Sequence, residues 1–226
     1  MARWDHPERG LVPPLDFIPL AEETGMILPI GNWILKEACR QVIAWREPLS
    51  SLHAADSLAV SVNLSAKQFQ QKDLAQDVLR ILGETGLPPS SLILEITESV
   101  VMDDAPLTTT IMDELKALGV NLSIDDFGTG YSSFSYLKRF PADYLKIDRS
   151  FVDSLGRDAE SAAIVSAMVN LAQDLGMKTV AEGIETTDQL ELLKEMGCEL
   201  GQGYHFARPL SPEDTIEMLS SNTQLV

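Results

Sequence analysis

Several polar side chains that can bind metal ions or transfer protons recur along the chain, each just after a short apolar run. In chain order they are Asn63, Glu95, Asp125, Asp126, Lys146, Glu182 and Gln202. Most of them offer the hard carboxylate or amide oxygens that Mg²⁺ and Mn²⁺ prefer. Zinc sites usually include histidine or cysteine, and His6, His53 and His205 lie away from these positions. The set therefore predicts an oxygen-rich site for Mg²⁺ or Mn²⁺.

The adjacent pair Asp125-Asp126 is informative within this set. Side chains on a regular strand alternate between its two faces, so two neighbouring aspartates at one site predict a distorted strand end. One carboxylate can then bridge two cations while its neighbour binds only the second. Two metal ions about 3.5–4 Å apart stabilise the attacking and leaving oxygens of a phosphoryl displacement. The pair indicates phosphodiester chemistry, in which Lys146 can orient the nucleophilic water or contact a phosphate oxygen.

Each of these residues also has an ordinary structural interpretation. An acidic residue at a strand end is more often the N-cap of the next helix than a ligand. Lys146 can be a salt-bridge partner, Asn63 can form an Asx-turn, and the run 126–130 can be a simple turn. These interpretations are reasonable one at a time. They do not explain why all of the residues occupy the same place in a repeating unit.

That repeating unit consists of an amphipathic helix, a glycine and a short strand. The predicted helices cover 72–85, 104–118, 160–175 and 187–196, and they end at Gly86, Gly119, Gly176 and Gly197. Glycine at this position supplies the left-handed conformation that ends a helix. Apolar residues with helical spacing predict the buried face of each helix. For the helix over 104–118 this face is Leu107, Ile111, Leu115 and Leu118.

The strands complete the unit and place the polar residues. They are predicted at 59–64, 92–97, 120–126, 144–147, 178–181 and 199–204. Strands that alternate with helices imply a parallel sheet. In a (β/α)₈ barrel the carboxyl ends of the strands converge on one face, whereas an open doubly wound sheet brings residues together only at its switch point. The sequence therefore predicts an α/β fold of the TIM-like barrel type, as one domain over 1–220 with a loose tail at 221–226.

Composition narrows the possible functions. The 226 residues carry 34 acidic and 17 basic side chains, a net charge of −17, which argues against DNA or RNA as a partner. No apolar run approaches the roughly 18 residues of a membrane span, and the N-terminus does not resemble a signal peptide. A cytoplasmic location is expected, although a parent protein could be anchored elsewhere. Cys39 and Cys198 are expected to be buried reduced thiols.

Six segments, in order, resemble motifs of the EAL domain family. They are SVNLS at 61–65, LEITE at 94–98, DDFGTGYSS at 125–133, KIDRSF at 146–151, AEGIE at 181–185 and GQGYHFARPL at 201–210. The run RWDHPERGLVPPLDFIPLAEETG at 3–25 is similar to the region just after the motif that names the family. The resemblance implies a modified TIM barrel that linearises cyclic di-GMP to pGpG with two Mg²⁺ or Mn²⁺ ions.

The resemblance also implies a role for each matched residue. The first metal ion would be bound by Asn63, Glu95 and Asp125, and the second by Asp125, Asp126 and Glu182. The residues implied in catalysis are Lys146, which would assist the water nucleophile, together with Glu182, Gln202 and Glu98. The residues implied in substrate binding are Arg3, Asp148, Glu185 and Gln202. Glu98 would brace the loop 127–136, which would also contribute to a homodimer contact.

The chain departs from the family pattern at its start. The pattern is E-A-L-x-R-W, and here the chain reads Met1-Ala2-Arg3-Trp4, so the motif glutamate would precede residue 1 together with the first strands. From this departure we expect weak or absent hydrolysis by the chain alone, because the first metal ion loses an anionic ligand. The alternative is a catalytically inactive EAL domain that binds cyclic di-GMP or a protein. The retained residues favour the enzyme, and a parent protein could carry upstream GGDEF or sensory domains.

Overall fold

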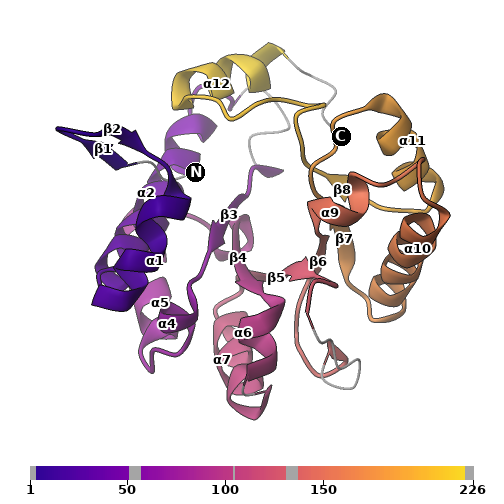
Figure 1. Cartoon of the computed structure of the whole chain (residues 1–226). Coiled ribbons are helices and arrows are strands. Elements are labelled where there is room, and N and C mark those ends of the chain that lie inside the picture. The colour runs from indigo at the N-terminus through magenta and orange to yellow at the C-terminus, as the bar shows by residue number, and fades with distance from the viewer. Residues whose placement is uncertain (1–3, 51–56, 104, 131–136, 222–226) are drawn as a thin grey trace. The chain divides into compact units, whose positions relative to one another are not determined.

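The computed structural model describes residues 4–50, 57–103, 105–130 and 137–221 of the chain (Figure 1). It divides into two compact units, which are described separately below. One unit contains residues 1–92 and 211–226, and the other contains residues 93–210. The prediction of a single domain over 1–220 stays a prediction.

The first unit is mainly helical. Its elements are the antiparallel strands β1 (Trp4–His6) and β2 (Gly10–Val12), the helices α1 (Pro14–Thr24), α2 (Ile27–Arg46), α4 (Ala66–Phe69), α5 (Leu74–Thr85) and α12 (Pro212–Ser221), a 3₁₀ turn (Pro89–Ser91) and the strand β3 (Val60–Asn63). Cys39 is buried among the apolar residues of α2 and is a free thiol, as expected. Cys198 is also a free thiol, but the expectation that it is buried was wrong, because it is only partly buried. No helix in the described part of the chain is long and apolar enough to cross a membrane.

The second unit alternates strands and helices. Its strands are β4 (Leu92–Thr97), β5 (Asn121–Phe127), β6 (Tyr144–Ile147), β7 (Lys178–Ala181) and β8 (Leu200–Gly201). Its helices are α6 (Glu98–Asp103), α7 (Ala105–Ala117), α9 (Arg149–Val152), α10 (Ala159–Asp174) and α11 (Thr187–Glu195). Neighbouring strands pair in parallel, and their order follows the chain from β4 to β8. This sequential order is typical of a barrel sheet and differs from the reversed order of a doubly wound sheet, so the predicted fold class is confirmed.

The pleat of these strands separates core from site. Fully buried apolar side chains occupy alternate positions, and they are Leu94, Ile96, Leu122, Ile124, Leu145 and Ile147. The residues between them are polar, because successive side chains on a strand point to opposite faces. Glu95, Ser123, Asp125 and Lys146 are thereby placed on the other face, and all four are buried.

The helix ends agree with the sequence, but one helical face does not. Gly86, Gly119, Gly176 and Gly197 all have the positive φ expected after a helix. In α7 the predicted face was partly wrong, because Leu107 is 48% exposed while Thr108, Met112 and Leu115 are buried. Thr108 and Met112 lie one position beyond the predicted Leu107 and Ile111, whereas Leu115 is buried as predicted. Two overlapping apolar faces were available in this helix, and tertiary packing decides between them.

The predicted strand over 199–204 was too long, since β8 contains only Leu200–Gly201. The chain then turns: Gln202 N donates to Ala181 O at 2.8 Å, and Ile184 N donates to Gln202 O at 3.1 Å. A Cβ atom at Gly203 would lie 2.2 Å from Ile184 O. Only glycine permits this close approach of two backbones, which ends the strand and brings Gln202 beside the segment after β7.

Candidate active site

Lys146 lies at the centre of a group of carboxylates. Its Nζ is 2.9 Å from Glu95 Oε2, 2.9 Å from Asp125 Oδ1 and 2.6 Å from Glu182 Oε1. The four residues come from β4, β5, β6 and the position just after β7. Lys146 is only 4% exposed. The predicted convergence of these strand ends on one site is therefore confirmed for the residues of the second unit.

The charges around Lys146 fix its protonation state. Burial alone would lower the pKa of its ammonium group, but Glu95, Asp125 and Glu182 together raise that pKa above its ordinary value. The raised pKa favours the ammonium form of Lys146, which can donate hydrogen bonds and supply positive charge.

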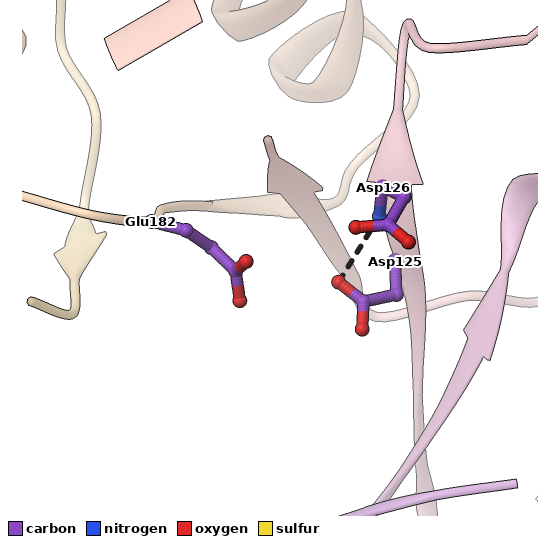
Figure 2. A group of neighbouring side chains, drawn as sticks. All are labelled: Asp125, Asp126 and Glu182. Carbon is purple, nitrogen blue, oxygen red and sulfur yellow. Dashed lines mark hydrogen bonds between the residues drawn. The ribbon is translucent and has the colours of Figure 1, made fainter. Parts of the chain in front are cut away.

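Asp125, Asp126 and Glu182 form the part of the site that best fits a cation (Figure 2). One carboxylate oxygen of each residue lies within 4.8 Å of the others. Asp126 has a φ of 55°, and the pairing of β5 with β6 shifts register between Ile124 and Phe127. Asp126 N donates to Asp125 Oδ1 at 3.0 Å. The predicted distortion of the strand end is confirmed, and it lets two successive aspartates reach one site.

The site around Lys146 holds more negative than positive charge. Burial is the largest cause that raises the pKa of Asp126, followed by the nearby charges of Asp125 and Asp148. Burial also raises the pKa of Glu182, although its contact with Lys146 opposes this change. One ammonium group does not balance the surrounding carboxylates. The all-oxygen donor set and the excess negative charge fit a hard divalent cation such as Mg²⁺ or Mn²⁺.

Gln202, the residue after β8, contacts the carboxylate of Glu182 in the same site. Its Nε2 lies 3.4 Å from Glu182 Oε1, the oxygen that also contacts Lys146. Glu182 N donates to Ile147 O at 3.1 Å, which aligns the end of β7 with the end of β6. The predicted neighbours Lys146, Glu182 and Gln202 are therefore brought together by the structure.

Glu98 holds the start of the loop that follows the two aspartates. It is 2% exposed, and its Oε2 accepts a hydrogen bond from Gly128 N at 2.8 Å. Gly128 has a φ of 93°, and a Cβ there would lie 2.2 Å from Met168 Cε. The bracing role of Glu98 that the motif implied stays a prediction. Residues 131–136 of that loop lie outside the described part of the chain. The predicted dimer contact of the loop therefore stays a prediction.

Two of the implied substrate-binding residues make local contacts. Asp148 caps α9, where its Oδ1 accepts from Ser150 N at 3.0 Å and from Ser150 Oγ at 2.5 Å. Glu185 forms an ion pair with Arg149, with 2.8 Å between Oε1 and Nη2. A role in substrate binding stays a prediction for both.

The two remaining predicted residues belong to the first unit. Asn63 is the last residue of β3, as predicted for a strand end. Arg3 lies outside the described residues. A metal contact of Asn63 and a phosphate contact of Arg3 stay predictions.

Arg149 was missed as a residue of interest. It follows Asp148, pairs with Glu185 and lies against Gly183, the residue after Glu182. The sequence offered two signals: Arg149 lies in the KIDRSF segment at 146–151, and its spacing of four residues from Asp153 is typical of an ion pair along a helix, which the structure contains at 3.0 Å. That spacing does not predict the contact with Gly183, because the two residues come from different strand-helix units.

The fold and site define an α/β protein of the barrel class with an acidic site at its strand ends. The family model described as "EAL domain" matches residues 1–209. The chain belongs to the EAL domain family.

Two curated relatives match most of the chain. The bifunctional diguanylate cyclase/cyclic di-GMP phosphodiesterase MucR of Pseudomonas aeruginosa is 50% identical over 96% of this chain and 31% of its own length. The cyclic di-GMP phosphodiesterase NbdA of the same organism is 45% identical over 93% of this chain and 26% of its own length. A solved structure of the MucR phosphodiesterase in complex with c-di-GMP matches this chain with a TM-score of 0.87 and 50% sequence identity. The match covers 94% of this chain and 84% of that chain. The chain thus spans about a third or less of the two curated relatives.

Proposed function

We propose that the site around Lys146 hydrolyses cyclic di-GMP to linear pGpG, with weak turnover by the chain alone. The observation that carries the proposal is the convergence of Glu95, Asp125 and Glu182 on one buried ammonium group, with Asp126 beside them. The relatives MucR and NbdA, which are named as cyclic di-GMP phosphodiesterases, support the same substrate. In this reaction the oxygen of water bonds to phosphorus, one P–O bond to a ribose 3′ oxygen breaks, and that oxygen gains a proton.

We assign the divalent cations to the carboxylates. Asp125, Asp126 and Glu182 would hold one ion, because their oxygens lie within 4.8 Å of one another. Glu95, Asp125 and Asn63 would hold the other, in accord with the motif resemblance. When bound, the two ions would stabilise negative charge on the phosphoryl oxygens and lower the pKa of water. Mg²⁺ and Mn²⁺ are the expected ions, since every donor is an oxygen.

The side chains of the chain itself orient the reactants. The ammonium group of Lys146 contacts Glu95, Asp125 and Glu182 and holds them in place, and it can also donate to a phosphate oxygen or to water. Gln202 restrains Glu182 from the β8 side. Glu98 holds Gly128 and thereby the backbone that follows Asp126. These contacts preorganise charge where the phosphodiester reacts, which is the largest contribution in many enzymes.

The proposal is tested by measuring pGpG formation with the purified chain in Mg²⁺ or Mn²⁺, with and without EDTA. Asp125→Asn should lower the rate at least about 100-fold, since it weakens a side chain that would serve as a ligand of both ions. The control is Asp174→Asn, an exposed change at the end of α10, which should leave the rate within about two-fold of wild type. Hydrolysis that survives EDTA or Asp125→Asn contradicts the proposal. Binding of cyclic di-GMP without any hydrolysis supports the inactive binding module instead.

Other expectations remain proposals. We infer a homodimer that uses the loop 127–136, upstream GGDEF or sensory domains in a parent protein, and a cytoplasmic location. Support for further domains comes from the greater length of MucR and NbdA, of which the chain covers 31% and 26%.

A further inference from the structure

Arg149 connects helix α9 to the segment that carries Glu182. Its Nη2 lies 2.8 Å from Glu185 Oε1, and its Nε lies 3.0 Å from Asp153 Oδ2. The planar guanidinium group can contact both carboxylates at once because its donors point in fixed directions. One side chain therefore links α9 to the end of the turn 182–185.

The aliphatic part of Arg149 makes a second contact with the same turn. Gly183 has a φ of 72°, a conformation that side chains rarely adopt. A Cβ atom there would lie 2.4 Å from Arg149 Cγ and 2.9 Å from Arg149 Cβ. The side chain of Arg149 thus lies directly on the backbone next to Glu182, in space that only glycine leaves open.

The rest of the turn is held by backbone hydrogen bonds on either side of Gly183. Glu182 N donates to Ile147 O at 3.1 Å, and Ile184 N donates to Gln202 O at 3.1 Å. Arg149 covers the residue between these two bonds. A shift of the Gly183 backbone would move the Glu182 carboxylate, which lies 2.6 Å from Lys146 Nζ.

We propose that Arg149 is a positioning residue that holds the 182–185 turn, and through it Glu182, in the geometry needed to bind a metal ion. The consequence for metal binding rests on the proposed function, whereas the effect on the turn does not. Arg149 acts through Glu182 and is not assigned a contact with substrate.

The exposure of the ion pairs separates this role from general stabilisation. Arg149 is 52% exposed at its side chain, and Glu185 and Asp153 are 41% and 43% exposed. Exposed ion pairs of this kind contribute about 0.2–1 kcal/mol to folding. Removing Arg149 should therefore change the global free energy of unfolding little, while the local geometry of the turn changes.

A nearby arginine offers a matched control. A cavity of about 500 Å³ is lined by Arg149, Asp153, Ser154, Arg157, Asp158 and Glu185. Arg157 shares this cavity and donates from Nη2 to Asp153 O at 2.5 Å. Among the described residues, Arg157 makes no hydrogen bond or ion pair with the turn 182–185. Arg157→Ala removes the same charge from the same cavity without touching the turn.

The first experiment measures hydrogen–deuterium exchange in peptides that cover residues 181–186. Arg149→Ala should speed exchange in these peptides, and Arg157→Ala should leave it at the wild-type rate. Arg149→Lys keeps much of the aliphatic stem and should give an intermediate rate. Unchanged exchange in Arg149→Ala, or equal changes in both alanine variants, overturns the proposal. If Arg149→Ala does not fold, the comparison of Arg149→Lys with Arg157→Lys decides in the same way.

The second experiment measures Mn²⁺ affinity by calorimetry together with kcat and KM for cyclic di-GMP. Arg149→Ala should weaken Mn²⁺ binding about 10-fold, the effect of losing support behind a ligand, and lower kcat more than it raises KM. Arg157→Ala should leave both within about two-fold of wild type. Unchanged Mn²⁺ affinity in Arg149→Ala overturns the link to Glu182. If the wild-type chain neither binds Mn²⁺ nor hydrolyses substrate, the proposed function fails, and hydrogen exchange still decides whether Arg149 holds the turn.

Discussion

Two lysine–carboxylate groups lie at opposite ends of the same strands. The Lys146 cluster (Lys146, Glu95, Asp125 and Glu182) lies at the carboxyl ends. The Lys116 cluster (Lys116 and Asp143) lies at the amino ends, where Lys116 Nζ contacts the two oxygens of Asp143 at 2.8 and 2.7 Å. Both groups contain salt bridges, but they differ in the ratio of positive to negative charge.

In the Lys116 cluster one ammonium group meets one carboxylate, and backbone groups use the rest of the hydrogen-bonding capacity. Asp143 Oδ2 accepts from Leu122 N at 2.8 Å, and Lys116 donates to Val120 O at 3.0 Å. In the Lys146 cluster one ammonium group meets three carboxylates, and it is only 5% exposed at its side chain. A balanced pair joins strands, whereas an unbalanced group gains from a further cation. The ratio of charges, and not the presence of an ion pair, separates the site from the structural link.

The largest expected effect comes from removing the ammonium group of Lys146, which is the positive charge of the Lys146 cluster. Lys146→Met should lower hydrolysis of cyclic di-GMP by more than about 100-fold, since the carboxylates lose their orientation and the reacting oxygens lose a donor. In EDTA the variant should also lose about 3 kcal/mol of unfolding free energy, because buried carboxylates are left without a counter-charge. Turnover assays and urea unfolding measure the two effects.

Mn²⁺ provides the control for that variant. Added Mn²⁺ should restore much of the lost stability of Lys146→Met, because a divalent cation can balance the same carboxylates, but it should not restore turnover. A variant that keeps more than a third of the wild-type rate would show that the cluster is structural, like the Lys116 cluster.

A smaller effect is expected at the balanced group. Lys116→Met should lower the unfolding free energy by about 1–2 kcal/mol, because Asp143 and Val120 O lose their donor. Hydrolysis per folded molecule should stay at the wild-type rate, since no residue of the Lys146 cluster contacts Lys116 among the described residues. Urea unfolding and active-site-normalised turnover separate the two quantities. A loss of turnover larger than the loss of folded protein would show that the Lys116 cluster also contributes to catalysis.

The elements that the sequence could predict are those set by local chemistry. Helix ends follow from glycines such as Gly119, whose φ is 86°, and strands follow from short β-rich runs. The meeting of Glu95, Asp125 and Lys146 could be predicted because parallel strand ends converge wherever the fold is of this class. The distortion at Asp126 followed from the alternation of side chains on a strand.

Other features depend on contacts between distant segments. The buried face of α7 is set by Thr108 in place of Leu107, which tertiary packing decides and local periodicity does not. The end of β8 depends on the approach of Gly203 to Ile184, and the contact of Arg149 with Gly183 joins two separate units.

The smallest effect concerns acid stability at the amino ends of the strands. Burial alone would raise the pKa of Glu199, but hydrogen bonds from Thr179 Oγ1 at 2.6 Å and Thr179 N at 2.9 Å lower it below its ordinary value. Because the folded pKa lies below the unfolded value of about 4.3, the carboxylate stabilises the fold above that pH. This contribution is lost as pH falls through the folded pKa.

Glu199→Gln should therefore be less stable than wild type at pH 7, and the difference should shrink between about pH 5 and pH 3. Urea midpoints at pH 7, 5, 4 and 3 measure it, and turnover at pH 7 should be unchanged. Thr179→Val is the matched variant, because it removes the hydroxyl donor while Thr179 N remains, so it should give part of the same effect. A difference that stays constant with pH would mean that Glu199 contributes through packing alone. Glu199 would then be held in place without any help from charge, unlike the carboxylates of the Lys146 cluster.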